Sequence, residues 1–238
     1  MDKIGTLVKL SLCDFPSKIA ATVFLAGCNM RCPYCYNTDL VKCKNTDYFV
    51  TLQEVIDYLQ KRKDVLQALV ISGGEALLHP ECKNIIQIAH RLGYRVKLDT
   101  NGTLPHLLKA LCSSPLLCPD YVAMDIKTSP SKYKELFGSN EDNAIYIEES
   151  LKESINIIKN SIGVKNSVFR TVLVPPLVQK EDIANIATLL PEGANWHLSP
   201  FRNGNCLNPN YSKIPPYTTQ QITELFNYAK SLCPNVKF

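Results

Sequence analysis

Short runs of apolar residues recur along the chain, and six of them are rich in residues that favour β-strands. Most of these runs are continuous rather than alternating, which is typical of strands buried on both faces of a parallel sheet. We therefore predict six strands, over residues 19–25, 68–71, 95–98, 121–124, 168–174 and 195–198.

Between these runs, apolar residues recur with the period of a helix. From Leu52 to Leu59 they fall at positions i, i+3, i+4 and i+7, behind Thr51 with Glu54 three residues later, which forms a capping-box pattern. The same spacing predicts helices over 85–92, 183–190 and about 218–232, and two less sharply bounded helices are predicted over 104–111 and 149–158.

Strand and helix alternate six times, and right-handed crossovers then require a mainly parallel sheet. Six units are too few for a closed eight-stranded barrel. The pattern leaves two α/β architectures open, an open curved partial barrel and a doubly wound sheet. Both place ligands at the carboxyl ends of the strands, so the residues after each strand are the candidates for chemistry.

Length and composition favour one folded domain. The chain has 238 residues, of which 45% are hydrophobic, and no Pro/Ser/Gly-rich linker or internal repeat divides it. We therefore expect a single domain over 1–238. The net charge of +4 is too small to indicate a nucleic-acid partner. The N-terminal residues resemble neither a signal peptide nor a membrane span, so we expect a cytoplasmic protein without a membrane partner.

The ten cysteines are more typical of reduced thiols and metal ligands than of a disulfide framework in such a chain. Three of them, Cys28, Cys32 and Cys35, fall within the loop over residues 26–37 with the spacing CxxxCxxC. Three thiolates on one loop suit zinc or the iron of an iron-sulfur cluster. A zinc site would need a fourth ligand, and the other cysteines offer no second pair with that spacing. The loop therefore favours a 4Fe-4S cluster with one iron free of protein, while a zinc-binding structural module stays open.

Polar residues follow the next three predicted strands. Gly73, Gly74 and Glu75 follow the second strand, Asp99 and Asn101 follow the third, and the fourth leads into Asp125 and Lys127. Each group is common in turns when taken alone. Together they place ligand-ready groups at one edge of the predicted sheet.

Those motifs resemble the radical S-adenosylmethionine (radical SAM) superfamily. The resemblance rests on the CxxxCxxC loop, with Tyr34 before its last cysteine, and on the Gly-Gly-Glu turn after the next strand. Longer segments resemble the activating proteins of anaerobic ribonucleoside-triphosphate reductase, from about Lys3 to the last helix: SLCDFPSKIAATVFLAGCNMRCPYCYN, VISGGE, VKLDTNG, YVAMDIK and FRTVLVPP. The resemblance implies a partial (β/α)6 TIM-like barrel.

The resemblance also implies a role for each candidate residue. Cys28, Cys32 and Cys35 would bind three irons, while S-adenosylmethionine chelates the fourth. The remaining residues would contact that cofactor: Tyr34 its adenine, Gly73, Gly74 and Glu75 its ammonium, Asp99 and Asn101 its methionine and ribose portions, Lys127 its carboxylate, and Arg202 a polar group. No side chain is assigned as a catalytic acid or base.

The implied reaction is reductive cleavage of S-adenosylmethionine, with an electron from a flavodoxin- or ferredoxin-type donor. The resulting 5′-deoxyadenosyl radical would remove a hydrogen atom from a glycine of a partner glycyl radical enzyme, here anaerobic ribonucleoside-triphosphate reductase. Two enzyme alternatives stay open: an activase of another glycyl radical enzyme, and a small-molecule radical SAM enzyme of the deazapurine-synthesis type. The chain is short for a barrel with a lid, which favours a protein loop as substrate.

Two positions depart from the activase pattern. Ala76 stands where Gly-Gly-Glu is commonly followed by proline, and Tyr36 stands where a histidine often follows the last cysteine. Neither departure removes a proposed ligand, although the lost imidazole could change the cluster's potential. The other seven cysteines are interpreted as core or surface residues: Cys13, Cys43, Cys82, Cys112, Cys118, Cys206 and Cys233.

Overall fold

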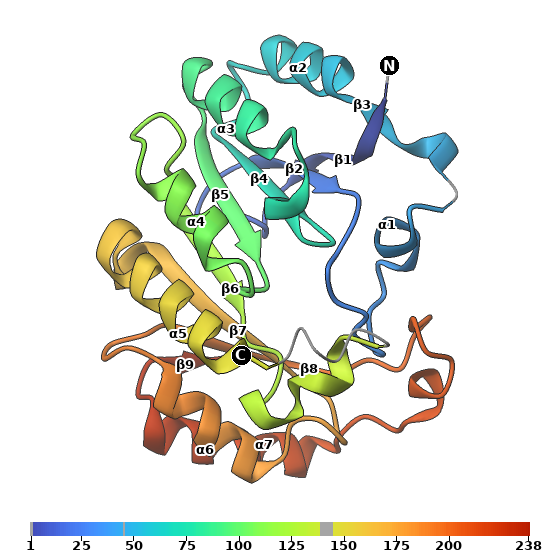
Figure 1. The fold of residues 1–238 in the computed structure, drawn as a ribbon, viewed down its shortest axis with the longest axis vertical. Coiled ribbons are helices and arrows are strands. Elements are labelled where there is room, and N and C mark those ends of the chain that lie inside the picture. The colour runs from blue at the N-terminus through green and yellow to red at the C-terminus, as the bar shows by residue number, and fades with distance from the viewer. Residues whose placement is uncertain (1, 45, 139–144) are drawn as a thin grey trace. The chain divides into compact units, whose positions relative to one another are not determined.

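The computed structural model describes residues 2–44, 46–138 and 145–238. Helices and strands alternate along the chain, as predicted, and are labelled in Figure 1. The residues divide into two compact units, which we describe separately. The first unit is Met1–Asn29, Asn37–Thr100 and His106–Val122, and the second is Met30–Tyr36, Asn101–Pro105 and Ala123–Phe238.

The strands of the first unit pair in the order β3-β1-β2-β4-β5. Strands β2, β4 and β5 are parallel neighbours. Their inner residues are fully buried because both faces of the strands are covered, as the continuous apolar runs predicted. The bounds are β1 Lys3–Ser11, β2 Ala20–Leu25, β3 Val50–Thr51, β4 Ala68–Gly73 and β5 Arg95–Thr100.

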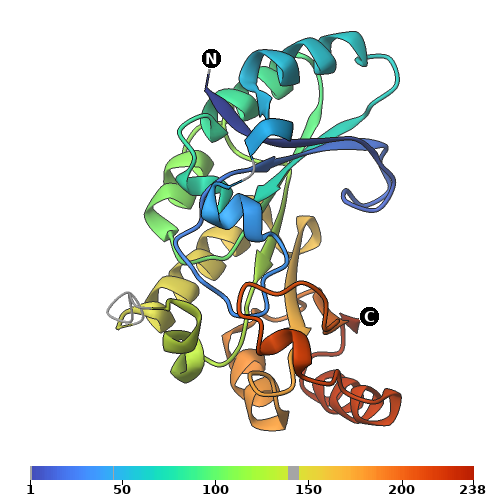
Figure 2. The same ribbon diagram turned by 90° about the vertical axis from the view of Figure 1, so that its right-hand side faces the viewer.

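Strand β1 was not predicted from the sequence. It pairs antiparallel with β2, and Figure 2 shows the two strands with the blue turn that joins them. Gly5 allows this pairing, because a Cβ at that position would lie 1.9 Å from the carbonyl oxygen of Phe24. This strand was not predicted because its apolar residues do not follow the pattern of a buried strand. Two of them, Val8 and Leu10, are exposed.

The helices of the first unit match the predicted ranges closely. Helix α2 begins after Thr51, and the Thr51 and Glu54 side chains form the predicted capping box. Helix α1, which follows the cysteine loop, was not predicted because it is only five residues long. The bounds are α1 Thr38–Lys42, α2 Leu52–Lys61, α3 Cys82–Arg91 and α4 Pro105–Cys112, whose first residue belongs to the second unit.

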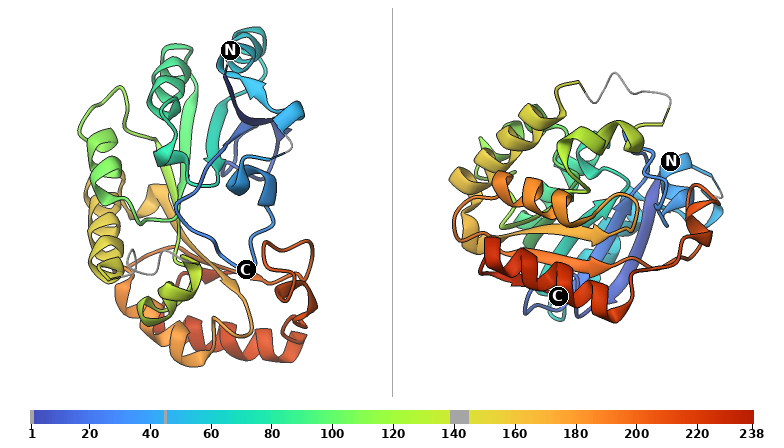
Figure 3. Two further views of the ribbon diagram at one scale, coloured as in Figure 1. Left: turned by 45° about the vertical axis from the view of Figure 1, so that its right-hand side comes forward. Right: turned by 90° about the horizontal axis from the view of Figure 1, so that it is seen from below.

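The second unit contains strands in the order β6-β7-β8-β9, with β7, β8 and β9 parallel. Trp196 on β8 is fully buried, and its Nε1 donates to Thr171 Oγ1 at 3.1 Å. Helices α6 and α7 lie side by side (Figure 3). The bounds are β6 Tyr121–Asp125, which begins in the first unit, α5 Ile147–Ile157, β7 Ser167–Leu173, α6 Lys180–Leu189, β8 Trp196–Pro200, α7 Thr219–Leu232 and β9 Val236–Lys237.

All six predicted strands are confirmed, and so are the six predicted helices. The short strands β3 and β9 were not predicted, since two residues give no readable pattern. In the part of the chain that the structure describes, no helix is long and apolar enough to cross a membrane.

A charged network ties α3 to β5 and β6 within the first unit. Asp120 Oδ2 lies 3.2 Å from His90 Nε2, and Asp120 Oδ1 lies 2.9 Å from Arg95 Nη1. His90 Nδ1 faces the carbonyl oxygen of Leu116 at 3.0 Å. Because both imidazole nitrogens face acceptors, above all the Asp120 carboxylate, the pKa of His90 lies above its usual value of 6.5. Burial alone would raise the pKa of Asp120, but the bonds from His90 and the Val96 N–H hold it below 3.8.

This network gives a pH-dependent prediction. The raised His90 pKa contributes stability that is fully present below the unfolded value and lost as pH rises through the folded value. The lowered Asp120 pKa contributes stability that is present above the unfolded pKa and is lost as pH falls through the folded value. We therefore expect His90→Asn to destabilise the protein by about 1 kcal/mol near pH 5, and by less above pH ~8. Denaturant unfolding at both pH values measures this. An equal loss at both would contradict the charged interaction.

Candidate functional site

The Gly-Gly-Glu turn lies against the start of the cysteine loop in the first unit. The Gly74 N–H donates to the Leu25 carbonyl at 3.0 Å, and the Glu75 N–H donates to the Gly27 carbonyl at 2.8 Å. A Cβ at Gly74 would lie 2.1 Å from the Gly27 oxygen and 2.9 Å from Cys28 Cβ. Only glycine fits at this contact, so the residue type at position 74 is fixed by the approach of the loop that carries Cys28.

The Glu75 side chain is fully buried beside this turn. Its Oε1 accepts hydrogen bonds from Thr100 Oγ1 at 2.8 Å and from the Leu77 N–H at 3.2 Å, which caps the short helix η2 (Ala76–Leu78). The buried carboxylate also acts on Cys82, whose pKa rises to about 12, mainly through burial and then through Glu75. Glu75 thus has a structural role that the sequence did not indicate, in addition to the one that the resemblance implies.

Asp99 belongs to a polar cluster at the ends of β4 and β5. Ser72 Oγ donates to Asp99 Oδ2 at 3.1 Å, and Lys97 Nζ pairs with Asp99 Oδ1. The Lys97 side chain is almost completely buried. Ser72 and Lys97 were not predicted as site residues. The available signal was the i, i+2 spacing of Lys97 and Asp99, which places both on the face of the strand opposite Val96 and Leu98.

In the second unit, Lys127 is paired with Asp125 two residues earlier. The Lys127 Nζ lies 2.8 Å from Asp125 Oδ2, and Arg170 Nε from β7 lies 2.6 Å from Asp125 Oδ1. Burial would raise the pKa of Asp125, but the two cations hold it far below its usual range. Burial would lower the pKa of Lys127, but Asp125 more than compensates and keeps the ammonium charged. Asp125 was noted at the end of its strand but was given no role in the site. Arg170 was not predicted, because it pairs with Asp125 from a neighbouring strand 45 residues away in sequence.

Cys32 and Cys35 lie in a tight turn of the second unit. The Cys35 N–H donates to the Cys32 carbonyl at 3.0 Å, which brings the two residues together at the ends of a four-residue turn. Tyr34, inside the turn, is 5% exposed and Cys32 is 8% exposed. Burial, and then the nearby Cys32 sulfur, raise the pKa of Tyr34 well above its usual value.

The segment after β8 contacts this turn in the second unit. The Leu207 N–H donates to the Cys35 carbonyl and the Asn208 N–H donates to the Pro33 carbonyl, both at 2.9 Å. The Arg202 side chain is exposed, and its backbone N–H donates to Tyr36 Oη at 3.1 Å. The Tyr36 ring also stacks on Phe201. Tyr36, which departs from the activase pattern, therefore attaches the segment after β8 to the cysteine turn.

Asn101 lies just after β5, in the second unit. Its Oδ1 accepts hydrogen bonds from Thr103 Oγ1 at 2.7 Å and from the Thr103 N–H at 3.0 Å. The side chain is 5% exposed. Asn101 therefore shapes the turn after β5 through its carbonyl oxygen.

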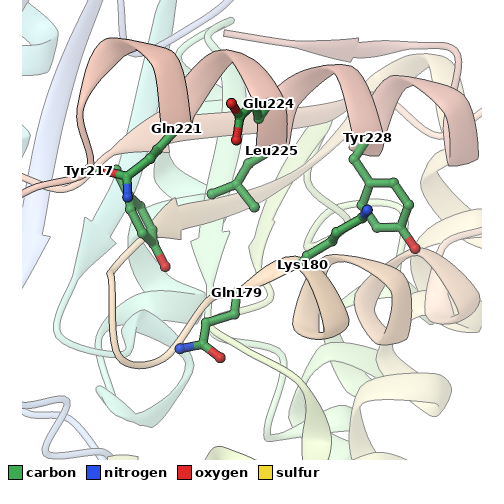
Figure 4. Close-up of a pocket in the computed structure, with 7 residues that line it drawn as sticks. All are labelled: Gln179, Lys180, Tyr217, Gln221, Glu224, Leu225 and Tyr228. Carbon is green, nitrogen blue, oxygen red and sulfur yellow. The ribbon is translucent and has the colours of Figure 1, made fainter.

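A separate groove in the second unit lies between α7 and the start of α6 (Figure 4). It has a volume of about 340 Å³. Lys180 Nζ lies 4.7 Å from the centre of the Tyr228 ring, and Tyr217 Oη donates to the carbonyls of Pro175 and Val178. None of the residues predicted for the cofactor site lines this groove.

The residues that are present fit a 4Fe-4S cluster and its cofactor in their chemistry. Cys28, Cys32 and Cys35 lie on one loop, and their sulfur atoms are donors of the kind that suits iron-sulfur clusters. The charged Lys127 ammonium suits the carboxylate of S-adenosylmethionine. Within each unit taken alone, the described residues contain no group of three His, Cys, Asp or Glu side chains arranged to hold a metal ion.

Comparison with known proteins identifies the family. Residues 22–190 match the model of the Radical SAM superfamily. A protein of Methanocaldococcus jannaschii, named "Putative glycyl-radical enzyme activating enzyme MJ1227", is 34% identical over 98% of this chain and 94% of its own length. The pyruvate formate-lyase-activating enzyme of Clostridium pasteurianum is 28% identical over 80% of this chain and 76% of its own length. The 7-carboxy-7-deazaguanine synthase of M. jannaschii is 28% identical over 81% and 79%.

Solved structures agree on the fold. The structure of TYW1 with a lysine-pyruvate adduct matches with a TM-score of 0.59 and 14% identity, over 90% of this chain and 74% of that one. QueE from Escherichia coli matches with a TM-score of 0.51 and 13% identity, over 82% of both chains. The predicted α/β fold of the partial TIM-like barrel type is thereby confirmed. The chain belongs to the radical SAM superfamily, whose members use a 4Fe-4S cluster and S-adenosylmethionine.

Proposed function

We propose that this protein activates a glycyl radical enzyme, and that its partner is an anaerobic ribonucleoside-triphosphate reductase. The observation that carries the proposal is the full-length likeness to a protein named as a glycyl-radical enzyme activating enzyme, with 34% identity over 98% of this chain. The same likeness supports one radical SAM domain over 1–238. The motifs after successive strands support the choice of partner, because they resemble the activases of that reductase.

In this proposal, the three cysteines of the loop, Cys28, Cys32 and Cys35, bind the cluster. A cluster held there would supply one-electron reduction of S-adenosylmethionine, which breaks one of its carbon-sulfur bonds. A flavodoxin- or ferredoxin-type protein serves as the electron donor. The protein's own part is to bind, orient and exclude water, which is the usual division of work between a protein and such a cofactor.

We assign the cofactor contacts to residues at the strand ends. In the first unit, the Gly73-Gly74-Glu75 turn binds the cofactor's ammonium. Asp99 accepts hydrogen bonds from hydroxyl or ammonium groups of the cofactor. The ion pair with Lys97 stabilises the negative charge of Asp99. The Glu75 carboxylate supports the turn from inside by capping η2.

In the second unit, Lys127 binds the cofactor's carboxylate, and Asp125 with Arg170 holds the ammonium in place. The Tyr34 ring lies beside the adenine. Asn101 and Arg202 contribute polar contacts at the rim. Of these two, Asn101 is held in place by the hydrogen bonds that its oxygen accepts from Thr103.

The proposal predicts a glycine-centred radical on the partner. The reconstituted and reduced protein, mixed with S-adenosylmethionine and the anaerobic reductase of the same organism, should give the doublet of a glycyl radical in electron paramagnetic resonance. Deoxyadenosine should form in an amount equal to the radical, and deuterium placed on the target glycine should appear in it. Omitting S-adenosylmethionine is the control.

A second candidate function is 7-carboxy-7-deazaguanine synthesis. The synthase of M. jannaschii is 28% identical over 81% of this chain, so the likeness extends beyond the cysteine loop. Release of 7-carboxy-7-deazaguanine, without a radical on any glycyl radical enzyme of the organism, would establish this activity and overturn the activase proposal. Zinc in place of iron and sulfide would overturn both.

A further inference from the structure

The hydroxyl group of Tyr34 lacks a hydrogen-bond partner although it is buried. Among the side chains that the structure describes, it is the buried polar atom that makes no hydrogen bond. Other buried tyrosines are paired: Tyr133 Oη accepts from the Lys127 N–H at 2.9 Å, and Tyr94 Oη donates to the Leu59 carbonyl at 2.7 Å. Burying an unpaired hydroxyl costs free energy, so such an atom indicates a partner that the chain does not itself supply.

The neighbours of Tyr34 within the second unit restrict what that partner is. Tyr34 lies inside the turn between Cys32 and Cys35, and the Tyr34 and Cys32 side chains are both almost completely buried. The other charged or titratable groups near Tyr34 are Lys127, Tyr133 and Asp125. Lys127 is a donor only, and Asp125, whose oxygens accept from Lys127 and Arg170, forms no hydrogen bond with the Tyr34 hydroxyl. The Tyr133 oxygen accepts from a backbone N–H. The sulfur of Cys32 is the neighbour whose acceptor capacity is created by binding iron, because a ligating cysteine is a thiolate.

We propose that the Tyr34 hydroxyl donates a hydrogen bond to sulfur at the Cys32 corner of the cluster and thereby raises the reduction potential of the cluster. The inference rests on the proposed cluster ligands. Donors to cluster sulfurs stabilise the more negative, reduced state, which is why hydrogen bonding tunes these potentials. Tyr34 acts here through Cys32 and is a positioning residue. Its ring keeps the role beside the adenine.

The test compares Tyr34→Phe with Tyr36→Phe in the full chain after anaerobic reconstitution. Each variant loses one hydroxyl from a residue next to Cys35. The Tyr36 hydroxyl differs from that of Tyr34 because it already accepts a hydrogen bond from the Arg202 N–H. We expect Tyr34→Phe to lower the equilibrium constant for one-electron reduction about tenfold, which is about 59 mV. Tyr36→Phe should change it less than twofold. Potentiometric titration followed by electron paramagnetic resonance measures both.

A second measurement uses the unmodified protein. Electron-nuclear double resonance of the reduced cluster should show a strongly coupled proton that disappears in D₂O, and this coupling should be missing in Tyr34→Phe. An unchanged potential and an unchanged coupling in Tyr34→Phe would overturn the inference. Weaker S-adenosylmethionine binding with an unchanged potential would also overturn it, since the hydroxyl would then face the cofactor. A wild-type protein without iron and sulfide would instead overturn the cluster ligands on which the proposal rests.

Discussion

Cys32→Ala is expected to abolish the 4Fe-4S cluster and, with it, cleavage of S-adenosylmethionine. Two remaining thiolates cannot hold the cluster against solvent and oxygen. The turn that joins Cys32 to Cys35 by a backbone hydrogen bond has no other sulfur to offer within it. Iron and sulfide per chain after anaerobic reconstitution measure the effect, together with the deoxyadenosine formed under reducing conditions. Both are expected to fall to background.

Cys112→Ala is the matched control for this experiment. Cys112 hydrogen-bonds with Cys118, and burial, followed by Cys118, raises its pKa to about 12. Cys112 ends helix α4, outside the cysteine loop, and is not one of the proposed cluster ligands. Iron content in Cys112→Ala should therefore equal that of the wild type. Full iron in Cys32→Ala would refute the assignment of the loop as the cluster site.

The strands that the sequence revealed best are those buried on both faces. Residues 68–71 form an unbroken apolar run, and the corresponding strand β4 is completely buried along it. Helix α2 was predicted equally well because its capping box and the spacing of its apolar residues indicate the same helix start. Strand β1 was missed because it pairs along its edge with β2 while its side chains at Val8 and Leu10 stay exposed. Strand pairing through backbone hydrogen bonds alone does not require a particular pattern of apolar and polar residues, so the sequence does not reveal it.

The candidate site shows the same division. The rule that ligands bind after parallel strands directed attention to Asp99 and Lys127, and both lie in charged clusters at strand ends. The partners in those clusters, Lys97 and Arg170, were not predicted. Arg170 reaches Asp125 from a strand 45 residues away in sequence, and only the pairing of strands brings such residues together. The burial of the Tyr34 hydroxyl likewise depends on tertiary packing, which no local motif encodes.

The second large effect is expected for Gly74→Ala, a change of a single methyl group. A Cβ at position 74 would lie 2.1 Å from the Gly27 carbonyl oxygen and 2.9 Å from Cys28 Cβ. The backbone on both sides is fixed by hydrogen bonds, from Gly74 to Leu25 and from Glu75 to Gly27. The turn can accept the methyl group only if these bonds lengthen and Cys28 moves. Overpacking of this kind costs about 1–3 kcal/mol.

Thermal unfolding of the cluster-free protein should therefore show a lower midpoint for Gly74→Ala, and reconstitution should give less iron per chain because the loop that carries Cys28 is displaced. Gly204→Ala is the control, since the atom nearest to its added Cβ would be Tyr36 Cε1 at 3.4 Å, an ordinary contact. Wild-type unfolding and full iron content in Gly74→Ala would show that the Gly-Gly-Glu turn and the cysteine loop are not held together by this contact. A lower midpoint with full iron would mean that the contact stabilises the fold without positioning Cys28. A lower midpoint together with a lower iron content would show that the close backbone contact at Gly74 both stabilises the fold and positions Cys28.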